Sequence, residues 1–260
     1  MNARTFALAA CCGWLVSPSP AALAHQSADD LARRVGFDQH LGRMVPRELV
    51  FRDEQGRDVR LGDYFGSVPV VLAFAYYGCS TLCPTVIGNL ADSLRRSGLE
   101  PGAQYRVVVV SIDPGDSPAL AERSKQAFLQ YASAGAGAWH LLTGSDAGIA
   151  AITAAAGFRY TYDDANHQYA HPAGIVLLTP DGRVARYFFG FDFTSAALRS
   201  GIEQASEKNI AAPAERLLLL CFHFDPAGKY SAAILQALRL IAMVMLAAAL
   251  AWAALRLRQR

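Results

Sequence analysis

Two cysteines lie four positions apart in the stretch YYGCSTLCPTV, residues 76–86. The apolar run VPVVLAFAYY precedes them and predicts a buried strand, while Pro84 suits the first turn of a following helix. Partial positive charge at a helix N-terminus lowers thiol pKa values, and the thiolate is both a nucleophile and a metal ligand. Cys79 and Cys83 could therefore form a disulfide, act as a redox couple, or hold a metal.

The spacing of the pair is C-x-x-x-C, one residue longer than the C-x-x-C of thioredoxin-type redox enzymes. The longer loop lets two sulfurs face one point, with a third ligand arriving from elsewhere in the chain. A disulfide is still feasible if the two Cα atoms come within about 7 Å. The spacing thus permits both metal binding and redox chemistry.

A metal centre would need a third donor, and histidine is the natural candidate. His167 and His171 come just before the predicted strand GIVLL, whose start should lie near the cysteine loop. We expect His171 to be the ligand and keep His167 as second choice, with His140 in a structural role. Asp113 is either a distant carboxylate donor or a loop cap. Two thiolates and one imidazole suit Cu(I), whereas structural zinc usually takes four protein ligands.

The order of predicted elements indicates an α/β fold. Strand–helix units are followed by a hairpin and a last helix, which describes a thioredoxin-like sandwich. The predicted strands span 68–77, 105–112, 139–142, 174–179 and 183–189, and the helices run from Pro84 to 97, 118–131, 145–156 and 194–208. Two shorter strands are expected around the Glu-Gln-Gly turn at residues 54–56.

The two ends of the chain resemble targeting and membrane segments. Residues 1–24 read as a signal peptide that ends Ala22-Leu23-Ala24, with an uncleaved anchor or a lipidated Cys11 as alternatives. We expect residues 25–48 to form a loosely held polar lead-in, residues 49–210 the main domain and residues 211–232 a juxtamembrane segment. Residues 233–256 predict a transmembrane helix, and the arginines that follow favour a cytoplasmic C-terminus. The expected location is the bacterial inner membrane, with a C-terminal single-pass anchor and the main domain in the periplasm.

Composition narrows the remaining choices. A net charge of +2, without a basic aromatic patch, argues against nucleic-acid binding. If the leader is removed, Cys79, Cys83 and Cys221 remain, and an odd number argues against a disulfide framework. Cys221 and His223, in CFHFDPAGKYS, form a possible second soft-metal site; alternatively, Cys221 is a free thiol.

Several stretches together resemble the Sco (SCO1/SenC) family of copper-binding assembly factors for cytochrome c oxidase. They are FAYYGCSTLCPT, VVVVSIDPGDSP and HPAGIVLLTPDGRVARYFFG, within roughly residues 45–207. The resemblance implies a thioredoxin fold, copper as Cu(I) or Cu(II), and delivery to the CuA site of oxidase subunit II. It also implies Cys79, Cys83 and His171 as the ligands, since the family histidine lies nine residues before the proline of the PDG turn.

The chain departs from the family pattern in three places. Ala170 and Pro172 flank the histidine where Asp and Ser are usual, Ser-Thr-Leu separates the cysteines where an acidic residue is common, and the anchor is C-terminal. A metallochaperone is the first functional hypothesis. The alternative is a thiol–disulfide reductase acting on oxidase subunit II or another exported protein, in which Cys79 attacks and Cys83 resolves.

Overall fold

The computed structural model describes residues 33–79, 82–129, 135–164, 166–213, 220–221, 240–241, 243 and 245. Residues 32–222 form one compact unit, and residues 1–31 with 223–260 form another. In the second unit, the four described residues are helical and exposed: Leu240, Ile241, Met243 and Met245. No helix within the described ranges is long and apolar enough to cross a bilayer. The expected signal peptide, and most of the expected transmembrane helix, lie outside those ranges.

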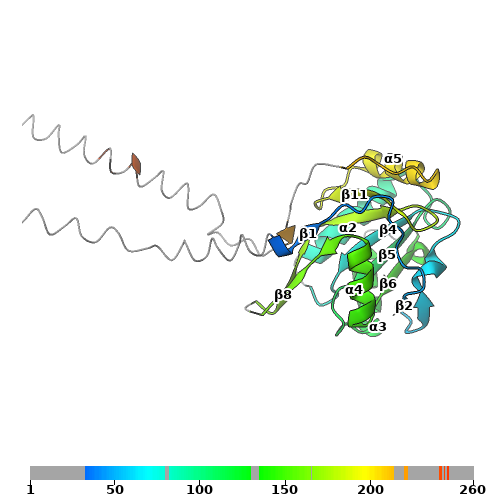
Figure 1. Cartoon of the computed structure of the whole chain (residues 1–260), viewed down its shortest axis with the longest axis horizontal. Helices are drawn as coiled ribbons and strands as arrows, with labels where there is room; N and C mark the ends of the chain where they lie inside the picture. Colours follow the sequence, from blue (N-terminus) through cyan, green and yellow to red (C-terminus); the bar gives the residue numbers. More distant parts are fainter. Residues whose placement is uncertain are drawn as a thin grey trace, which may run out of the picture. The chain divides into compact units, whose positions relative to one another are not determined.

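A five-stranded sheet forms the centre of the main unit, in the order β11-β10-β4-β5-β6 (Figure 1). Its strands are β4 (Val70–Ala75), β5 (Arg106–Ser111), β6 (Trp139–Leu142), β10 (Gly174–Leu178) and β11 (Val184–Phe189). β4, β5 and β6 pair in parallel, while β10 runs antiparallel to both β4 and β11. β4 is buried along its whole length, as expected for a strand covered on both faces.

Both faces of this sheet are covered because successive strand residues point to opposite sides. One face packs against α2 (Leu82–Ser97), α3 (Pro118–Leu129) and α5 (Ser195–Ser206). The other packs against α4 (Asp146–Ala155) and apolar side chains from the segment 37–65. That segment contains β2 (Val50–Arg52), β3 (Asp58–Arg60) and the 3₁₀ helix η1 (Leu61–Tyr64). A short 3₁₀ turn, η2 (Ala136–Ala138), precedes β6.

Helix boundaries follow local chemistry closely. The side chains of Ser145 and Thr194 accept hydrogen bonds from backbone N–H groups and so cap α4 and α5. α2 begins at Leu82, one residue before Cys83, so the second cysteine lies in the first turn and not ahead of the helix as expected. Its inner face is formed by the predicted apolar residues, all of them buried: Ile87, Leu90, Ala91 and Leu94.

The part of the lead-in that is described is more ordered than its sequence indicated. Val35, Phe37 and Val45 are buried, and β1 (Gly36–Phe37) pairs with β7 (Phe158–Arg159). The expectation of a loosely held lead-in is therefore wrong for residues 35–45. Phe37 and Val45 belong to the apolar cluster on one face of the central sheet, and partly buried Leu41 packs against the same cluster.

A small second sheet, β12-β9-β8, was not expected from the sequence. It consists of β8 (Thr161–Asp163), β9 (Gln168–Pro172) and β12 (Leu220–Cys221), all antiparallel. β9 is followed after one residue by β10, whose first residue, Gly174, has a φ of +149°. A Cβ atom at this position would lie 2.5 Å from the carbonyl oxygen of Phe188, so only glycine fits here without a shift.

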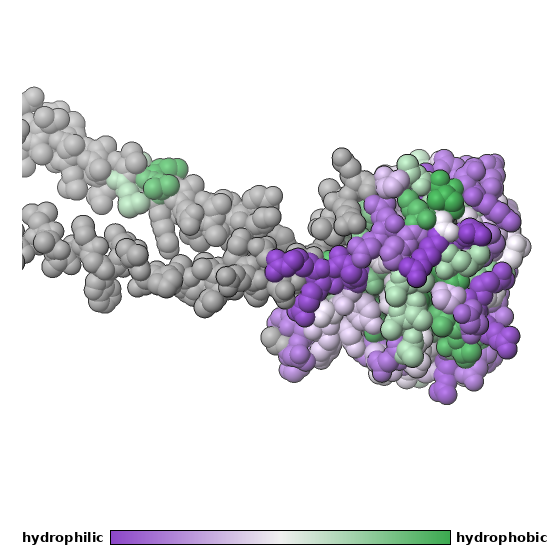
Figure 2. Space-filling view, viewed as in Figure 1, coloured by the Kyte–Doolittle hydropathy of each residue, from purple (hydrophilic) through white to green (hydrophobic). Residues whose placement is uncertain are grey.

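Figure 2 shows hydrophilic residues interleaved with smaller apolar patches on the face of the main unit that it presents. Exposed large apolar side chains in that unit are scattered along the chain, for example Met44, Val50 and Phe191. Single exposed apolar residues of this kind are normal on soluble proteins.

Candidate metal and thiol site

The cysteine loop leaves the sheet at the end of β4 and is fastened to it by hydrogen bonds. The backbone N–H of Tyr77 donates to Asp116 Oδ2 at 2.7 Å, and the Tyr77 hydroxyl donates to the carbonyls of Val109 and Leu142, both at 3.0 Å. The N–H of Cys79 then turns back to the carbonyl of Tyr76 at 3.2 Å. The loop is therefore held from its first residues to the first cysteine.

Asp116 has a second partner on the sheet, because its Oδ2 also accepts from the Ser111 hydroxyl at 2.5 Å. Burial raises the pKa of Asp116, and the hydrogen bonds from Ser111 and Tyr77 oppose that rise. Asp116 and Tyr77 were not among the site residues predicted from the sequence. The signal was available in DPGDSP, where an aspartate follows the neighbouring strand at the same edge of the sheet.

The two cysteines differ in exposure. Cys83 is 2% exposed in the first turn of α2, while Cys79 is partly exposed on the loop, and neither forms a disulfide. Cys79 is therefore the more accessible of the two thiols. Cys83 is the one held in the core.

His171 is buried on β9, with 4% of its surface exposed. Its Nδ1 lies 3.0 Å from the carbonyl oxygen of Pro172, so this nitrogen carries the proton and donates. Nε2 is left with its lone pair, and it lies 3.5 Å from the sulfur of Cys83. Burial lowers the pKa of His171, opposed by the Pro172 carbonyl and by Cys79, which favours the neutral imidazole that metals bind.

The space beside this contact is small. A cavity of about 10 Å³ is lined by Cys83, His171 and apolar residues from β4, α2 and the β9–β10 junction. That volume is close to one water-sized sphere. The cavity can therefore hold a single ion but not an organic substrate.

Two aromatic rings enclose the imidazole. Phe158 and Tyr76 lie 6.0 and 6.2 Å from the His171 ring, measured between centroids. Tyr169, two residues earlier on β9, packs against Tyr76 at 5.5 Å. These rings, together with the burial of His171, limit the access of water to the imidazole.

The structure brings two of the three predicted ligands together. Cys83 and His171 are in contact, whereas no three histidine, cysteine or carboxylate side chains within the described ranges are close enough to hold a metal. Cys79 influences the His171 pKa but lies outside such a group. The full ligand set of Cys79, Cys83 and His171 therefore stays a prediction.

The other candidate residues lie elsewhere. His167 is exposed in the turn between β8 and β9, with a φ of +50°. His140, on β6, packs against Tyr64 of η1, with 4.6 Å between the ring centroids. Asp113 accepts from the N–H of Gly115 at 2.8 Å and from the Tyr169 hydroxyl at 3.4 Å, as a loop cap would.

The backbone of Cys221 lies next to that of His171. It lies in β12, directly opposite His171 in the antiparallel register. His223, its predicted companion in a second site, lies outside the described residues.

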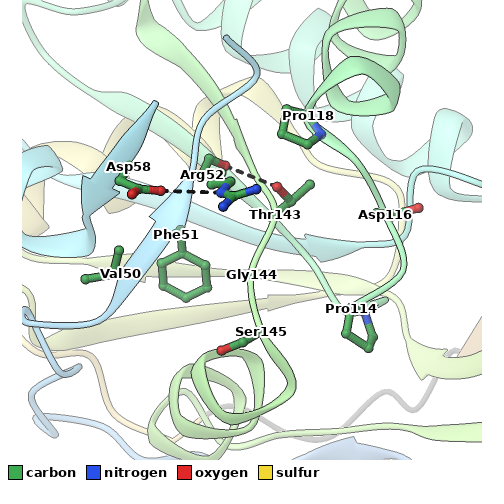
Figure 3. Close-up of a pocket in the computed structure, with 10 residues that line it drawn as sticks. All are labelled: Val50, Phe51, Arg52, Asp58, Pro114, Asp116, Pro118, Thr143, Gly144 and Ser145. Carbon is green, nitrogen blue, oxygen red and sulfur yellow. Dashed lines mark hydrogen bonds and ion pairs between the residues drawn. The ribbon is translucent and has the colours of Figure 1, made fainter. Parts of the chain in front are cut away.

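A larger cleft of about 450 Å³ is lined by Asp116 together with residues of β2 and of the connection between β6 and α4 (Figure 3). Its polar side chains engage one another: Arg52 pairs with Asp58 at 3.4 Å, and Thr143 donates to the Arg52 carbonyl at 3.4 Å. Ser145, on its floor, caps α4. None of the described residues that line this cleft is a cysteine or a histidine, so those residues offer no thiol or imidazole ligand.

The fold is a mixed β-sheet covered by helices on both faces. A C-x-x-x-C pair leads into one of these helices, and a histidine lies on a neighbouring hairpin. Together these features define a thioredoxin-like protein with a thiol or metal centre. A sequence profile of the SCO1/SenC family matches residues 41–206. The chain belongs to this family, and the resemblance drawn from its motifs is confirmed. No curated protein sequence matches the chain significantly.

Solved structures agree on the fold. A putative electron transfer protein from Aquifex aeolicus has a TM-score of 0.57 and 21% identity, covering 64% of this chain and 95% of its own. ScoI of Arabidopsis thaliana with copper bound has a TM-score of 0.52 and 17% identity, covering 62% and 96%. BsSco, a member of the Sco family of cytochrome c oxidase assembly proteins, has a TM-score of 0.52 and 21% identity, covering 66% and 97%.

Proposed function

We propose that this protein binds copper through Cys79, Cys83 and His171 and delivers it during assembly of cytochrome c oxidase. The observation that carries the proposal is the contact of Cys83 with the lone-pair nitrogen of a buried, neutral His171, beside a cavity of one-ion size. Family membership supports it, as does a relative of the same fold solved with copper bound.

The donor set fits copper on chemical grounds. Two thiolates and an imidazole are soft ligands, and Cu(I) accepts a three-coordinate set. In the proposed loading step, Cys79 closes onto the Cys83–His171 pair around the ion. In the proposed delivery step, the partly exposed Cys79 is the first ligand that an acceptor displaces.

We further propose an acceptor for the copper and a cellular location for the protein. The acceptor is the CuA site of oxidase subunit II. The leader is cleaved and the domain that carries the site lies in the periplasm. The C-terminal apolar segment, residues 233–256, anchors this domain to the bacterial inner membrane. Fractionation of cells expressing the full chain, with protease added to intact spheroplasts, tests this topology: degradation of the domain in the spheroplasts supports it, and protection opposes it.

A second function rests on the unequal exposure of the two thiols. Cys79 is accessible and Cys83 is buried four residues later, the arrangement of an attacking and a resolving cysteine. BsSco, of the same fold, is described as containing a disulfide switch. A thiol–disulfide reductase that acts on subunit II or another exported protein is therefore the alternative.

Anaerobic titration of the reduced full chain with Cu(I), against a competing chelator, separates the two functions. His171→Ala should weaken binding by more than about 100-fold, because even groups that only support a ligand contribute ten- to 100-fold. The same variant should retain most of its dithiol redox activity. His167→Ala is the matched control and should bind as the wild type does.

Weak wild-type binding that is indifferent to His171 would reject the copper function and favour the reductase.

A further inference from the structure

Cys221 lies far from the cysteine motif in the sequence but meets it in the fold. Strand β12 is Leu220–Cys221, and it pairs with the end of β9. In this register, Leu220 is opposite Pro172 and Cys221 is opposite His171. The residue opposite the buried imidazole is therefore a third cysteine.

The register also fixes the face of the sheet on which residue 221 lies. Directly opposed residues of an antiparallel pair share a face, with Cβ atoms about 4.5–5.5 Å apart. Cys221 is thus placed on the face of β9 that carries His171. The sulfur of Cys83 approaches Nε2 of that same imidazole at 3.5 Å.

We propose that Cys221 supplies a third thiolate to the centre formed by Cys79, Cys83 and His171. The inference rests on the proposed copper function and deepens it, because it assigns a fourth protein ligand that the C-x-x-x-C and histidine motifs do not contain. This assignment takes the place of the separate second metal site that the sequence suggested for Cys221 and His223. The backbone register joins Cys221 to the first centre.

Three thiolates and one imidazole give the centre more donors than Cu(I) needs. Soft thiolates favour Cu(I), and a set of four allows one donor to leave while three remain. Cys79 is the donor that can leave, since it is partly exposed while Cys83 and His171 are buried. Cys83, His171 and Cys221 then hold the ion until the acceptor's own ligands replace them.

The main test is a Cu(I) titration of the reduced full chain in mild detergent, combined with X-ray absorption spectroscopy of the loaded protein. The wild type should bind one copper with three sulfur neighbours. Cys221→Ser should weaken binding by at least about tenfold, the lower end of what groups around a metal contribute, and should reduce the sulfur count to two. The control variant His223→Ala should change neither quantity.

Two results would overturn the assignment. One is a Cys221→Ser chain with wild-type affinity and sulfur count. The other is a second bound copper that is lost in both Cys221→Ser and His223→Ala, which would establish a separate site. A wild-type chain that binds no Cu(I) would reject the copper function and this ligand assignment together.

Proximity can be measured without copper. In a Cys79→Ser chain, the oxidant diamide should take two electrons and two protons from the thiols of Cys83 and Cys221 and leave a disulfide between them. Mass spectrometry of the digested monomer should then find the linked peptides containing residues 83 and 221. Their absence, with Cys221 oxidised only between chains, would contradict the placement of β12 beside His171.

Discussion

Two regions of the main unit each hold a histidine, His171 fully buried and His140 partly buried, and only the His171 region resembles a metal site. On β9, His171 faces the sulfur of Cys83 and is fixed by the Pro172 carbonyl. On β6, His140 packs against Tyr64, in an environment influenced by the charges of Glu54 and Lys125. Burial is the largest influence on both pKa values and lowers both.

The difference lies in what each imidazole meets. Both rings are kept neutral, so both nitrogens that lack a proton could in principle bind a metal. Only His171 has a thiol within 3.5 Å. Around His140, a carboxylate and an ammonium group have already paired with each other. A neutral histidine shielded from water is therefore not enough to indicate a metal ligand; the groups around the imidazole decide.

The largest effect is expected at the ion pair of the His140 region. Glu54 is buried, and it pairs with Lys125 and accepts from the N–H of Leu141 at 3.1 Å. Lys125→Met would leave this carboxylate buried without its cation, and we expect a loss of about 3–5 kcal/mol in the free energy of unfolding. Urea denaturation measures the loss, and Cu(I) affinity should stay unchanged.

Arg123→Met is the matched control, since Arg123 is exposed on the same helix. It should change stability by less than about 0.5 kcal/mol. A Lys125→Met chain as stable as this control would show that the ion pair does not distinguish the two regions.

Asp116 is expected to have the next largest effect, in the His171 region. Asp116→Ala removes the acceptor for the Tyr77 N–H and the Ser111 hydroxyl, leaving donors unpaired at a cost of about 1–3 kcal/mol. Because Tyr77 begins the cysteine loop, Cu(I) binding should weaken as well. Chelator competition and urea denaturation on one preparation would check both. A stability loss without any change in affinity would contradict a positioning role.

Acid should affect the His140 region in a defined window. Burial lowers the pKa of His140 to about 4 from the 6.5 of an unfolded chain. Below pH 6.5 the unfolded state binds a proton that the folded state refuses, so stability is lost as the pH falls toward 4. Between pH 7 and pH 5 we expect this group to remove about 2 kcal/mol.

His140→Phe should remove that contribution and flatten the pH dependence of unfolding. Its Cu(I) affinity at pH 7 should equal that of the wild type. An unchanged pH profile would mean that other groups set the acid sensitivity and that the contrast with His171 needs another basis.

The sequence predicted most of the central fold but not the hairpin that carries His171. Strongly apolar runs such as residues 68–77 and the cap at Ser145 were sufficient for β4 and α4. The hairpin of β8 and β9 was missed because its strands are short and rich in polar residues. An alternation was present in Phe158, Tyr160 and Tyr162, followed by turn-forming residues, and it could have indicated a strand.

For the site, the sequence indicated which side chains could be metal ligands but not how far apart they lie in the fold. Cys83 and His171 were chosen from spacing and motif, and their contact depends on the pairing of distant segments. The approach of Cys221 to His171 could not be anticipated. It depends on a two-residue strand, which is too short to produce a periodic pattern.

The smallest predicted effect concerns the link between the two regions. Tyr77 begins the cysteine loop, while its hydroxyl donates to Val109 on β5 and to Leu142 on β6, the strand of His140. Tyr77→Phe keeps the ring and removes this bridge, and net values for single hydrogen bonds predict a loss of about 1 kcal/mol in stability. Cu(I) affinity should fall less than in Asp116→Ala, because the backbone bond of residue 77 remains.

Tyr64→Phe is the matched control, since it removes the hydroxyl of a ring that packs against His140 and leaves the cysteine loop untouched. If Tyr77→Phe lowers affinity and Tyr64→Phe does not, the sheet helps to position the cysteine loop. Equal affinities in both variants would confine loop positioning to Asp116, and the two histidine regions would then be independent of each other.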